Sequence, residues 1–231
     1  MPSKNTIKNY FSGGYYHVYN RGVEKRKIFL DTQDCNTFIY YIKLYLSSVE
    51  TIAHLSDSNS KLTRFLRLNL SNDVEILTFA LMPNHFHLFL KNKTLKGIQI
   101  FMQRLITAYV MYFNNKYDRV GGLFQGRYKA SFVENDSYNI HLSRYIHNNS
   151  VRLRTNSKIN FAEYSSYPYY LNKKQGDWIN TTFILDYFEN NYGTSDRIAA
   201  YKAFVESNIS DSLKLLESSN LLLENDCISS L

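Results

Sequence analysis

Two apolar runs separated by a three-residue break constrain the fold of this chain more than any other feature. Residues 74–81 and residues 85–90 are both rich in apolar side chains, as strands that pack in a core require. Met82-Pro83-Asn84 lies between them, and proline cannot donate a hydrogen bond inside a sheet. The pattern predicts two strands that return on each other as a central antiparallel hairpin.

Further elements are predicted on both sides of this hairpin from apolar spacing and capping residues. They are a strand at 15–20, a helix at 32–46 with Asp31 as its N-cap, a polar loop at 55–61, a helix capped by Thr94 that ends near 116, a strand at 131–133, a helix from Asn135-Asp136 to about 148 and a helical tail from about Ser195. This order predicts an α+β protein of the ferredoxin-like, βαββαβ type, with helices on one face of an antiparallel sheet.

Charge and cysteine content narrow the class of function. The 231 residues carry a formal net charge of +7, which favours a polyanionic partner such as nucleic acid. The two cysteines, Cys35 and Cys227, cannot form a disulfide framework. The sequence starts without the apolar segment of a signal peptide, and no apolar run approaches a membrane span. We therefore expect a cytoplasmic protein without a membrane partner.

His85-Phe86-His87 is the sharpest local feature. Side chains alternate along a strand, so both imidazoles should project from one sheet face and could bind one metal ion, while Phe86 points the other way. Two histidines can also occupy a half-exposed strand without any function, and short motifs of this kind match often by chance. The pair alone is therefore a hypothesis of two metal ligands.

Tyr145 and Asn149 lie four residues apart on the predicted helix after Asp136 and so share one helix face. If that face looks onto the histidines, Asn149 could offer a carbonyl oxygen to the metal and Tyr145 could present its phenol. A tyrosine is attractive for phosphodiester chemistry because a covalent phosphotyrosine keeps the bond for later rejoining. The other interpretation is a core aromatic and a helix C-cap. Tyr138, seven residues earlier, is the rival nucleophile, but it lacks an asparagine at i+4.

Four blocks in this order resemble the REP-associated tyrosine transposases, within the single-tyrosine HUH transposases. The blocks are Tyr16-His17-Val18-Tyr19-Asn20-Arg21-Gly22, Ala80-Leu81-Met82-Pro83-Asn84-His85-Phe86-His87-Leu88, Phe124-Gln125-Gly126-Arg127-Tyr128-Lys129 and Tyr145-Ile146-His147-Asn148-Asn149-Ser150-Val151-Arg152. The similarity runs from about Tyr15 to Tyr170. The chain departs from the family at Ser150, where a proline is common and would help to end the helix.

The resemblance implies an HUH nuclease fold, with the transposase domain at 1–155 and an aromatic-rich segment and helical tail at 156–231. It implies that His85 and His87 are metal ligands, that Asn149 fills the third ligand position and that Tyr145 is the nucleophile. Members of the family cut single-stranded DNA beside hairpins with Mg²⁺ or Mn²⁺ and form a 5′-phosphotyrosine link. The expected function is thus DNA transposition or a domesticated form of it.

Basic residues near these blocks are expected to bind the DNA backbone, with aromatic rings available to stack bases. They are Arg21, Lys25, Arg26, Arg127, Lys129, Arg144 and Arg152. His17, His54, His141 and His147 are not expected to be ligands. His17 could face the site from the first strand, but it is interpreted as a satisfied sheet histidine. Two rival functions are a non-catalytic binder of hairpin DNA or RNA and a phosphoesterase with a second motif at His141-Leu142-Ser143. Association as a homodimer is left open.

Overall fold

The structure is a computed structural model that describes residues 9–54, 59–151, 153, 158–193, 196–207 and 209–218. The strands are β1 (Tyr15–Arg21), β2 (Val74–Met82), β3 (His85–Asn92) and β4 (Lys129–Val133). The helices are α1 (Thr32–Leu46), α2 (Val49–His54), α3 (Asn59–Leu68), α4 (Gly97–Lys116), α5 (Asp136–Val151), α6 (Tyr167–Tyr170), α7 (Thr182–Tyr192), α8 (Arg197–Glu206) and α9 (Ser210–Ser218). Two 3₁₀ turns, η1 (Val23–Lys25) and η2 (Phe161–Tyr164), complete the elements.

The four strands form one antiparallel sheet in the order β2-β3-β1-β4. β2 and β3 form the predicted hairpin, with Met82 paired to His85 across the turn Pro83-Asn84. With α1 between β1 and β2 and α4 between β3 and β4, this is the βαββαβ connectivity and confirms the predicted ferredoxin-like class.

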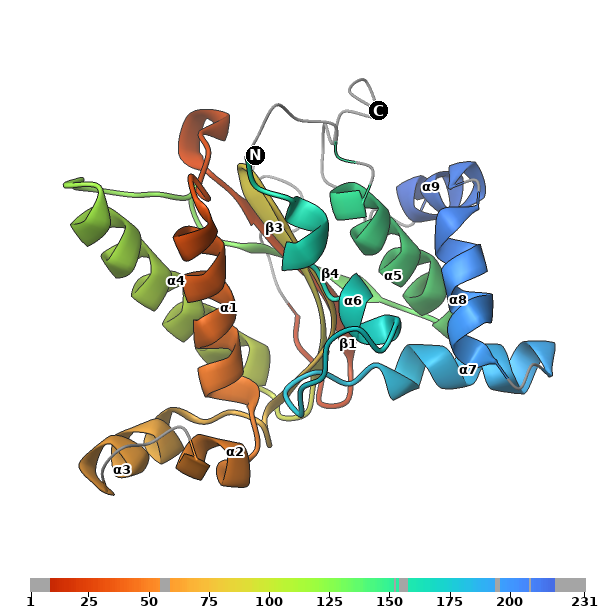
Figure 1. Cartoon of the computed structure of the whole chain (residues 1–231), viewed down its shortest axis with the longest axis horizontal. Helices are drawn as coiled ribbons and strands as arrows, with labels where there is room; N and C mark the ends of the chain where they lie inside the picture. Colours follow the sequence, from red (N-terminus) through yellow and green to blue (C-terminus); the bar gives the residue numbers. More distant parts are fainter. Residues whose placement is uncertain are drawn as a thin grey trace.

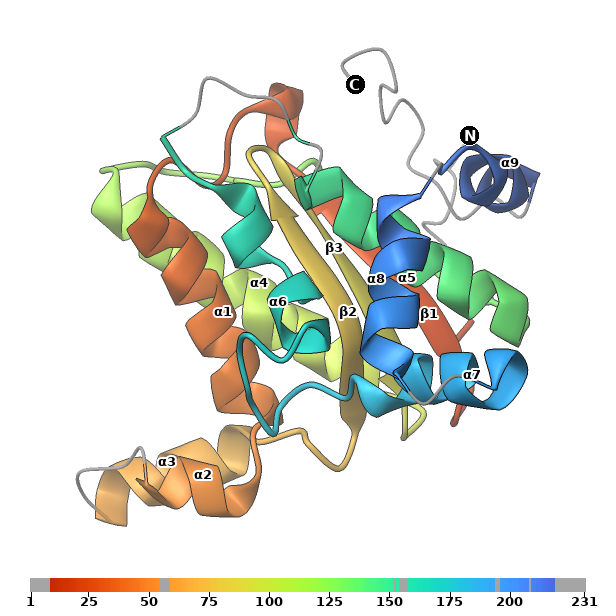
Figure 2. The ribbon, with the colours of Figure 1, turned by 45° about the vertical axis from the view of Figure 1, so that its right-hand side comes forward.

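Helices cover both faces of the sheet, whereas the sequence predicted them on one face (Figures 1 and 2). α1 and α4 pack on the face that carries Val18, Phe86 and Leu88. α5, α7 and α8 pack on the other face, against Phe89 and its neighbours. Strands that are buried on both faces give nearly continuous apolar runs, as residues 74–81 and 85–90 do, whereas a strand buried on one face would alternate apolar and polar residues. The prediction missed the second layer because it did not use this difference.

The predicted helix at 32–46 is confirmed, and its start shows why it forms there. The Asp31 side chain accepts a hydrogen bond from the Asp34 backbone N–H, and the Asp34 carboxylate accepts one from the backbone N–H of Asp31. This reciprocal capping box satisfies two of the backbone donors that a helix start leaves unpaired. The exposed capping residue therefore fixes where α1 begins.

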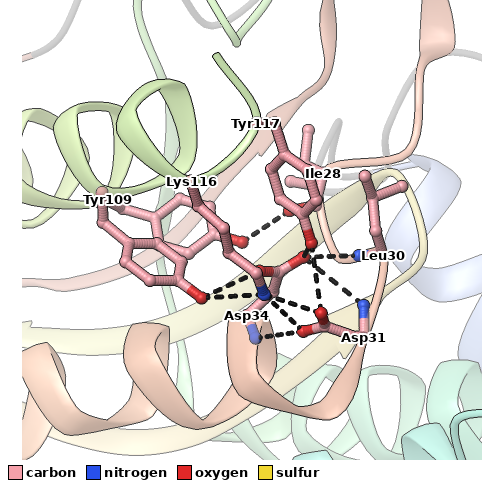
Figure 3. A network of polar contacts seen from close by, with 8 residues as sticks. Ile28, Leu30, Asp31, Asp34, Tyr109, Lys116 and Tyr117 are labelled. Carbon is pink, nitrogen blue, oxygen red and sulfur yellow. Dashed lines mark hydrogen bonds and ion pairs between the residues drawn. The ribbon is translucent and has the colours of Figure 1, made fainter. Parts of the chain in front are cut away.

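A buried polar network joins the start of α1 to the end of α4 (Figure 3). Lys116 Nζ contacts Asp31 Oδ2 at 2.6 Å and Asp34 Oδ1 at 2.8 Å. Tyr117 donates its hydroxyl proton to Asp34 Oδ2 at 2.8 Å, and Tyr109 donates to the carbonyl oxygen of Ile28. Because the Asp34 side chain is fully buried, this carboxylate depends on these partners.

Two predicted boundaries in the first half of the chain differ from the structure. The predicted loop at 55–61 is partly wrong, because α3 already begins at Asn59; residues 55–58 lie outside the described part of the chain. Thr94 does not cap the helix at 97–116, since its hydroxyl bonds to the Asp73 carboxylate and its carbonyl accepts from Gly97. Across the described residues, no helix combines the length and hydropathy needed to cross a membrane.

α5 continues past Ser150 to Val151, three residues beyond the predicted end near 148. The Ser150 hydroxyl donates to the carbonyl oxygen of His147 at 3.0 Å, a bond within the helix that a proline could not make. With serine at position 150, the helix continues to Val151.

Candidate active site

β3 carries His85 and His87 on the sheet face that α5 covers. Their ring centroids lie 5.0 Å apart with the planes nearly perpendicular, and Phe86 points into the core on the opposite face. His87 is fully buried and His85 is 9% exposed. The alternation along the strand therefore brings the two imidazoles together as the sequence indicated.

The sheet register adds two cations to this face. Arg21 pairs with His85 across β1 and β3, and Tyr19 pairs with His87 on one side and with Lys129 on the other. Residues that pair across an antiparallel sheet present their side chains on the same face. Arg21 and Lys129 therefore share the sheet face of the two histidines.

α5 lies across this face and supplies Tyr145 (Figures 1 and 2). The Tyr145 ring meets His87 edge-on at 5.6 Å between centroids and meets His17 at 6.3 Å. Tyr145 is only 3% exposed, so a large partner could reach its hydroxyl only after local movement of α5 or of its neighbours. Tyr138, two turns earlier, is half-buried and packs against the apolar cluster that α5, α7 and α8 form with this sheet face.

Both histidines of β3 are held neutral. Burial lowers the pKa of His85 to about 3, with a further contribution from the Arg21 charge. Burial also lowers the pKa of His87 well below its usual range, and the neighbouring His85 and His17 act in the same direction. Only a neutral imidazole binds a metal ion, so both rings are in the required form at neutral pH.

The hydrogen bonds of Asn84 fix the tautomer of His85. Asn84 Nδ2 donates to the Lys25 carbonyl oxygen at 3.1 Å, which assigns Oδ1 to the other end of the amide. That Oδ1 lies 2.7 Å from His85 Nδ1, so Nδ1 carries the proton and donates it. The lone pair of His85 consequently sits on Nε2.

The residues present fit a divalent cation. Asn149 lies one helical turn beyond Tyr145, and its Nδ2 position is buried without a hydrogen-bond partner. A half-turn of the amide would place Oδ1 at that point; carbonyl oxygens suit Mg²⁺ or Mn²⁺, and imidazole nitrogens suit first-row transition metals. The described residues contain no cluster of three or more His, Cys, Asp or Glu side chains that could hold a metal, so a site here depends on the asparagine.

The loop after β1 brings Lys25 and Arg26 to the same end of the sheet. Glu24 and Lys25 both adopt a positive φ, of 56° and 58°, a conformation that non-glycine residues rarely take. Gly22 is required at the loop start, because a Cβ there would lie 2.3 Å from the Arg26 carbonyl oxygen. The Asn84 bond to Lys25 thus ties this strained loop to the hairpin turn beside His85.

The remaining predicted DNA-binding residues have different surroundings. Arg127 is exposed just before β4. Arg144 is 4% exposed: its guanidinium donates to the hydroxyls of Ser207 and Ser212 and lies 4.3 Å from the Phe204 ring. In this structure Arg144 holds the C-terminal helices, and it could reach DNA only if they moved. Arg152 lies outside the described residues.

Two residues at the site were given no role in the prediction. His17 Nε2 lies 2.9 Å from His87 Nδ1, so this hydrogen-bonded sheet histidine faces the site, the alternative that the sequence left open. Tyr19 contacts both rings, at 4.9 Å from His17 and 6.2 Å from His87. The signal for both was their period-two spacing with Arg21, which places all three on one face of β1.

Comparisons with known proteins agree with the motifs. A search of curated protein sequences found no match. A solved structure of a REP-associated tyrosine transposase bound to a REP hairpin aligns over 77% of this chain and 92% of that one, at 14% identity and a TM-score of 0.46. The profile of the family described as "Transposase IS200 like" matches residues 52–149, which include the His-x-His motif, Tyr145 and Asn149. Over this segment the chain is similar to the IS200-like transposases, in agreement with the resemblance seen in its motifs.

Proposed function

We propose that the protein is a metal-dependent endonuclease and strand transferase for single-stranded DNA next to hairpins, with Tyr145 as the nucleophile. The contact between Tyr145 and His87 carries the proposal, because it joins a helix residue to a strand motif 58 positions earlier in the chain. The match of residues 52–149 to IS200-like transposases supports the reaction class.

Tyr145 would attack a DNA phosphorus atom through its phenolic oxygen. A Tyr–O–P bond forms and the P–O3′ bond breaks, so the 5′ phosphate becomes attached to tyrosine. The phenolic proton is lost to solvent, and the departing 3′ oxygen takes up a proton to become a hydroxyl. Attack of a 3′ hydroxyl on the phosphotyrosine reverses these bond changes and rejoins DNA.

His85, His87 and Asn149 are the residues that would hold the cation. When bound, Mg²⁺ or Mn²⁺ supplies polarisation of the scissile phosphate and stabilisation of the charge that develops on its oxygens. His85 offers Nε2 for this purpose because Asn84 occupies Nδ1. Asn149 offers its amide from the same helix as Tyr145, which couples the position of the ligand to that of the nucleophile.

Hairpin DNA is the proposed partner. Arg21 and Lys129 share the sheet face of the histidines, and Arg127, Lys25 and Arg26 lie at its ends. Such cations neutralise backbone phosphates without reading sequence, so they would position the strand. The contributions of Arg144 and Arg152, a homodimer, a cytoplasmic location and a domain boundary near 155 remain predictions.

A covalent-trapping experiment tests the reaction. Purified protein and Mn²⁺ would be incubated with labelled hairpin oligonucleotides that carry single-stranded flanks, and the products separated on a denaturing gel. We expect a protein–DNA band that disappears in Tyr145→Phe and persists in Tyr138→Phe, a matched control on the same helix.

The other outcomes are informative. A band that survives in Tyr145→Phe and disappears in Tyr138→Phe would transfer the nucleophile to Tyr138. Tight hairpin binding without a covalent band for any substrate would favour the non-catalytic binder.

A further inference from the structure

We propose that His17 is a positioning residue that fixes the orientation and tautomer of His87, so that His87 binds the metal through Nε2. This inference rests on the proposed function, because it assigns a partner to one of its metal ligands.

Strand geometry explains how the two rings meet. In the antiparallel register of β1 and β3, His17 pairs with Phe89, and Tyr19 pairs with His87. His17 is therefore the diagonal neighbour of His87 on one sheet face, a separation that an imidazole can bridge. The rings stack with centroids 5.1 Å apart and an angle of 19° between their planes.

The hydrogen bond decides which nitrogen of His87 is available. His17 Nε2 and His87 Nδ1 lie 2.9 Å apart, and both side chains are fully buried. Because Nδ1 is engaged with His17, coordination by His87 must use Nε2. That in turn requires the proton of the shared bond to reside on His87 Nδ1, with His17 Nε2 as the acceptor.

His85 is held in the same way by a different residue. Asn84 accepts the proton of His85 Nδ1 at 2.7 Å, so each histidine of the motif has its Nδ1 occupied by a protein partner. Each Nε2 atom then carries a lone pair, and these two atoms are the ones that would coordinate the metal ion. His17 also meets the Tyr145 ring edge-on, at 6.3 Å between centroids. The same side chain therefore contacts both the proposed ligand His87 and the proposed nucleophile.

The first test is metal binding by two variants of the whole protein. His17→Phe keeps a ring but removes the hydrogen bond, and His17→Gln keeps a side-chain acceptor. By calorimetric titration with Mn²⁺ alone, we expect affinity to fall about 10- to 100-fold in His17→Phe and to recover partly in His17→Gln. Cleavage by His17→Phe should need correspondingly more Mn²⁺, with little loss at saturation.

A merely structural role would give a different pattern. Folded His17→Phe with the Mn²⁺ affinity of the wild type would overturn the inference while leaving the proposed function intact. If wild-type protein bound no Mn²⁺, or bound it equally well after His85→Ala, the metal site itself would be refuted and the role of His17 with it.

A measurement on the wild-type protein covers the case in which His17→Phe does not fold. In long-range ¹H–¹⁵N spectra of metal-free, histidine-labelled protein, we expect His87 as the Nδ1–H tautomer. An Nε2–H tautomer would refute the proposed arrangement.

Discussion

At the scale of single residues, the proposed site depends on which nitrogen of each buried imidazole coordinates the metal. Burial keeps both rings neutral, and Asn84 and His17 occupy their Nδ1 atoms. Removing one ring should therefore abolish coordination without breaking the sheet, because the backbone pairing of β3 with β1 and β2 does not use side chains.

We expect His85→Ala to remain folded, to lose Mn²⁺ binding and to lose the covalent DNA product. The matched control is His54→Ala: His54 is exposed at the end of α2, outside the proposed site, and its variant should keep both properties. Metal titration and the trapping gel measure the two effects. Undiminished cleavage by soluble His85→Ala would refute its role as a ligand.

Arg127 and Arg144 form a contrasting pair for DNA binding, since one is exposed and the other buried. We expect Arg127→Ala to weaken hairpin binding and to reduce the slope of log K against log salt by about 1. Arg144→Ala should instead lower the free energy of unfolding, by about 1–3 kcal/mol, because its hydrogen bonds to Ser207 and Ser212 are lost.

Filter binding across a salt series and urea unfolding separate the two effects. An unchanged salt slope in Arg127→Ala would exclude that residue from the DNA path. A large reduction of the slope in stable Arg144→Ala would mean that the C-terminal helices do uncover Arg144.

At the scale of elements, α1 and α4 are joined by a carboxylate that has no access to water. Asp34 is fully buried and shares Lys116 with the more exposed Asp31 (Figure 3). Contacts with Lys116 and with the Asp34 backbone N–H outweigh desolvation and lower the pKa of Asp31. The contribution of Asp31 to stability is therefore present near neutral pH and is lost as the pH falls through its lowered folded pKa.

We expect Lys116→Met to lower the free energy of unfolding by about 3 kcal/mol, because it leaves the Asp34 charge buried without its cation. The control is Lys174→Met, which removes an exposed pair with Glu163 and should cost less than about 1 kcal/mol. Urea unfolding at pH 7 measures both. Equal costs would show that the network adds nothing beyond a surface ion pair.

His147 connects α5 to α8 and to the segment just before α6. Its Nδ1 lies 2.7 Å from the Tyr201 hydroxyl on α8, and its Nε2 lies 2.6 Å from the Ser166 hydroxyl before α6. Burial lowers the pKa of His147 to about 3, whereas an unfolded histidine titrates near 6.5. The unfolded chain thus binds the proton first, and the stabilising contribution is full above about pH 6.5 and declines as the pH falls toward 3.

From this shift we expect His147 to account for about 2 kcal/mol of the stability lost between pH 7.5 and pH 5. His147→Gln, which does not titrate, should show a correspondingly smaller loss over the same range. Urea unfolding of both proteins at the two pH values measures the difference. An identical pH dependence would mean that His147 is accessible and titrates normally in the folded state.

At the scale of the whole molecule, the helix with the proposed nucleophile lies between the sheet and the C-terminal helices (Figure 2). Asn148 donates to the carbonyl oxygen of Val205, and His141 bonds to Ser212 at 2.7 Å. Residues far along the chain therefore set the position of α5, and with it the distance of Tyr145 from the histidines.

This arrangement predicts an effect of α8 on the reaction. We expect Tyr201→Phe, which removes one contact of His147, to retain Mn²⁺ affinity but to alter the rate of covalent trapping, because Tyr145 must leave its buried position to meet DNA. Single-turnover trapping at saturating Mn²⁺ measures the rate. An unchanged rate would show that the movement of α5 does not limit the reaction.

The sequence alone determined the hairpin and the capped helix α1 and showed the resemblance to tyrosine transposases, because period-two alternation, a capping aspartate and ordered motif blocks are local signals. It also placed His85 with His87 on one face, and Tyr145 with Asn149 on one turn. Only the tertiary structure decided that α5 covers the histidine face and that Arg144 is buried. It also decided that His17 meets His87, since strand order, register and helix packing depend on contacts between residues distant in the chain.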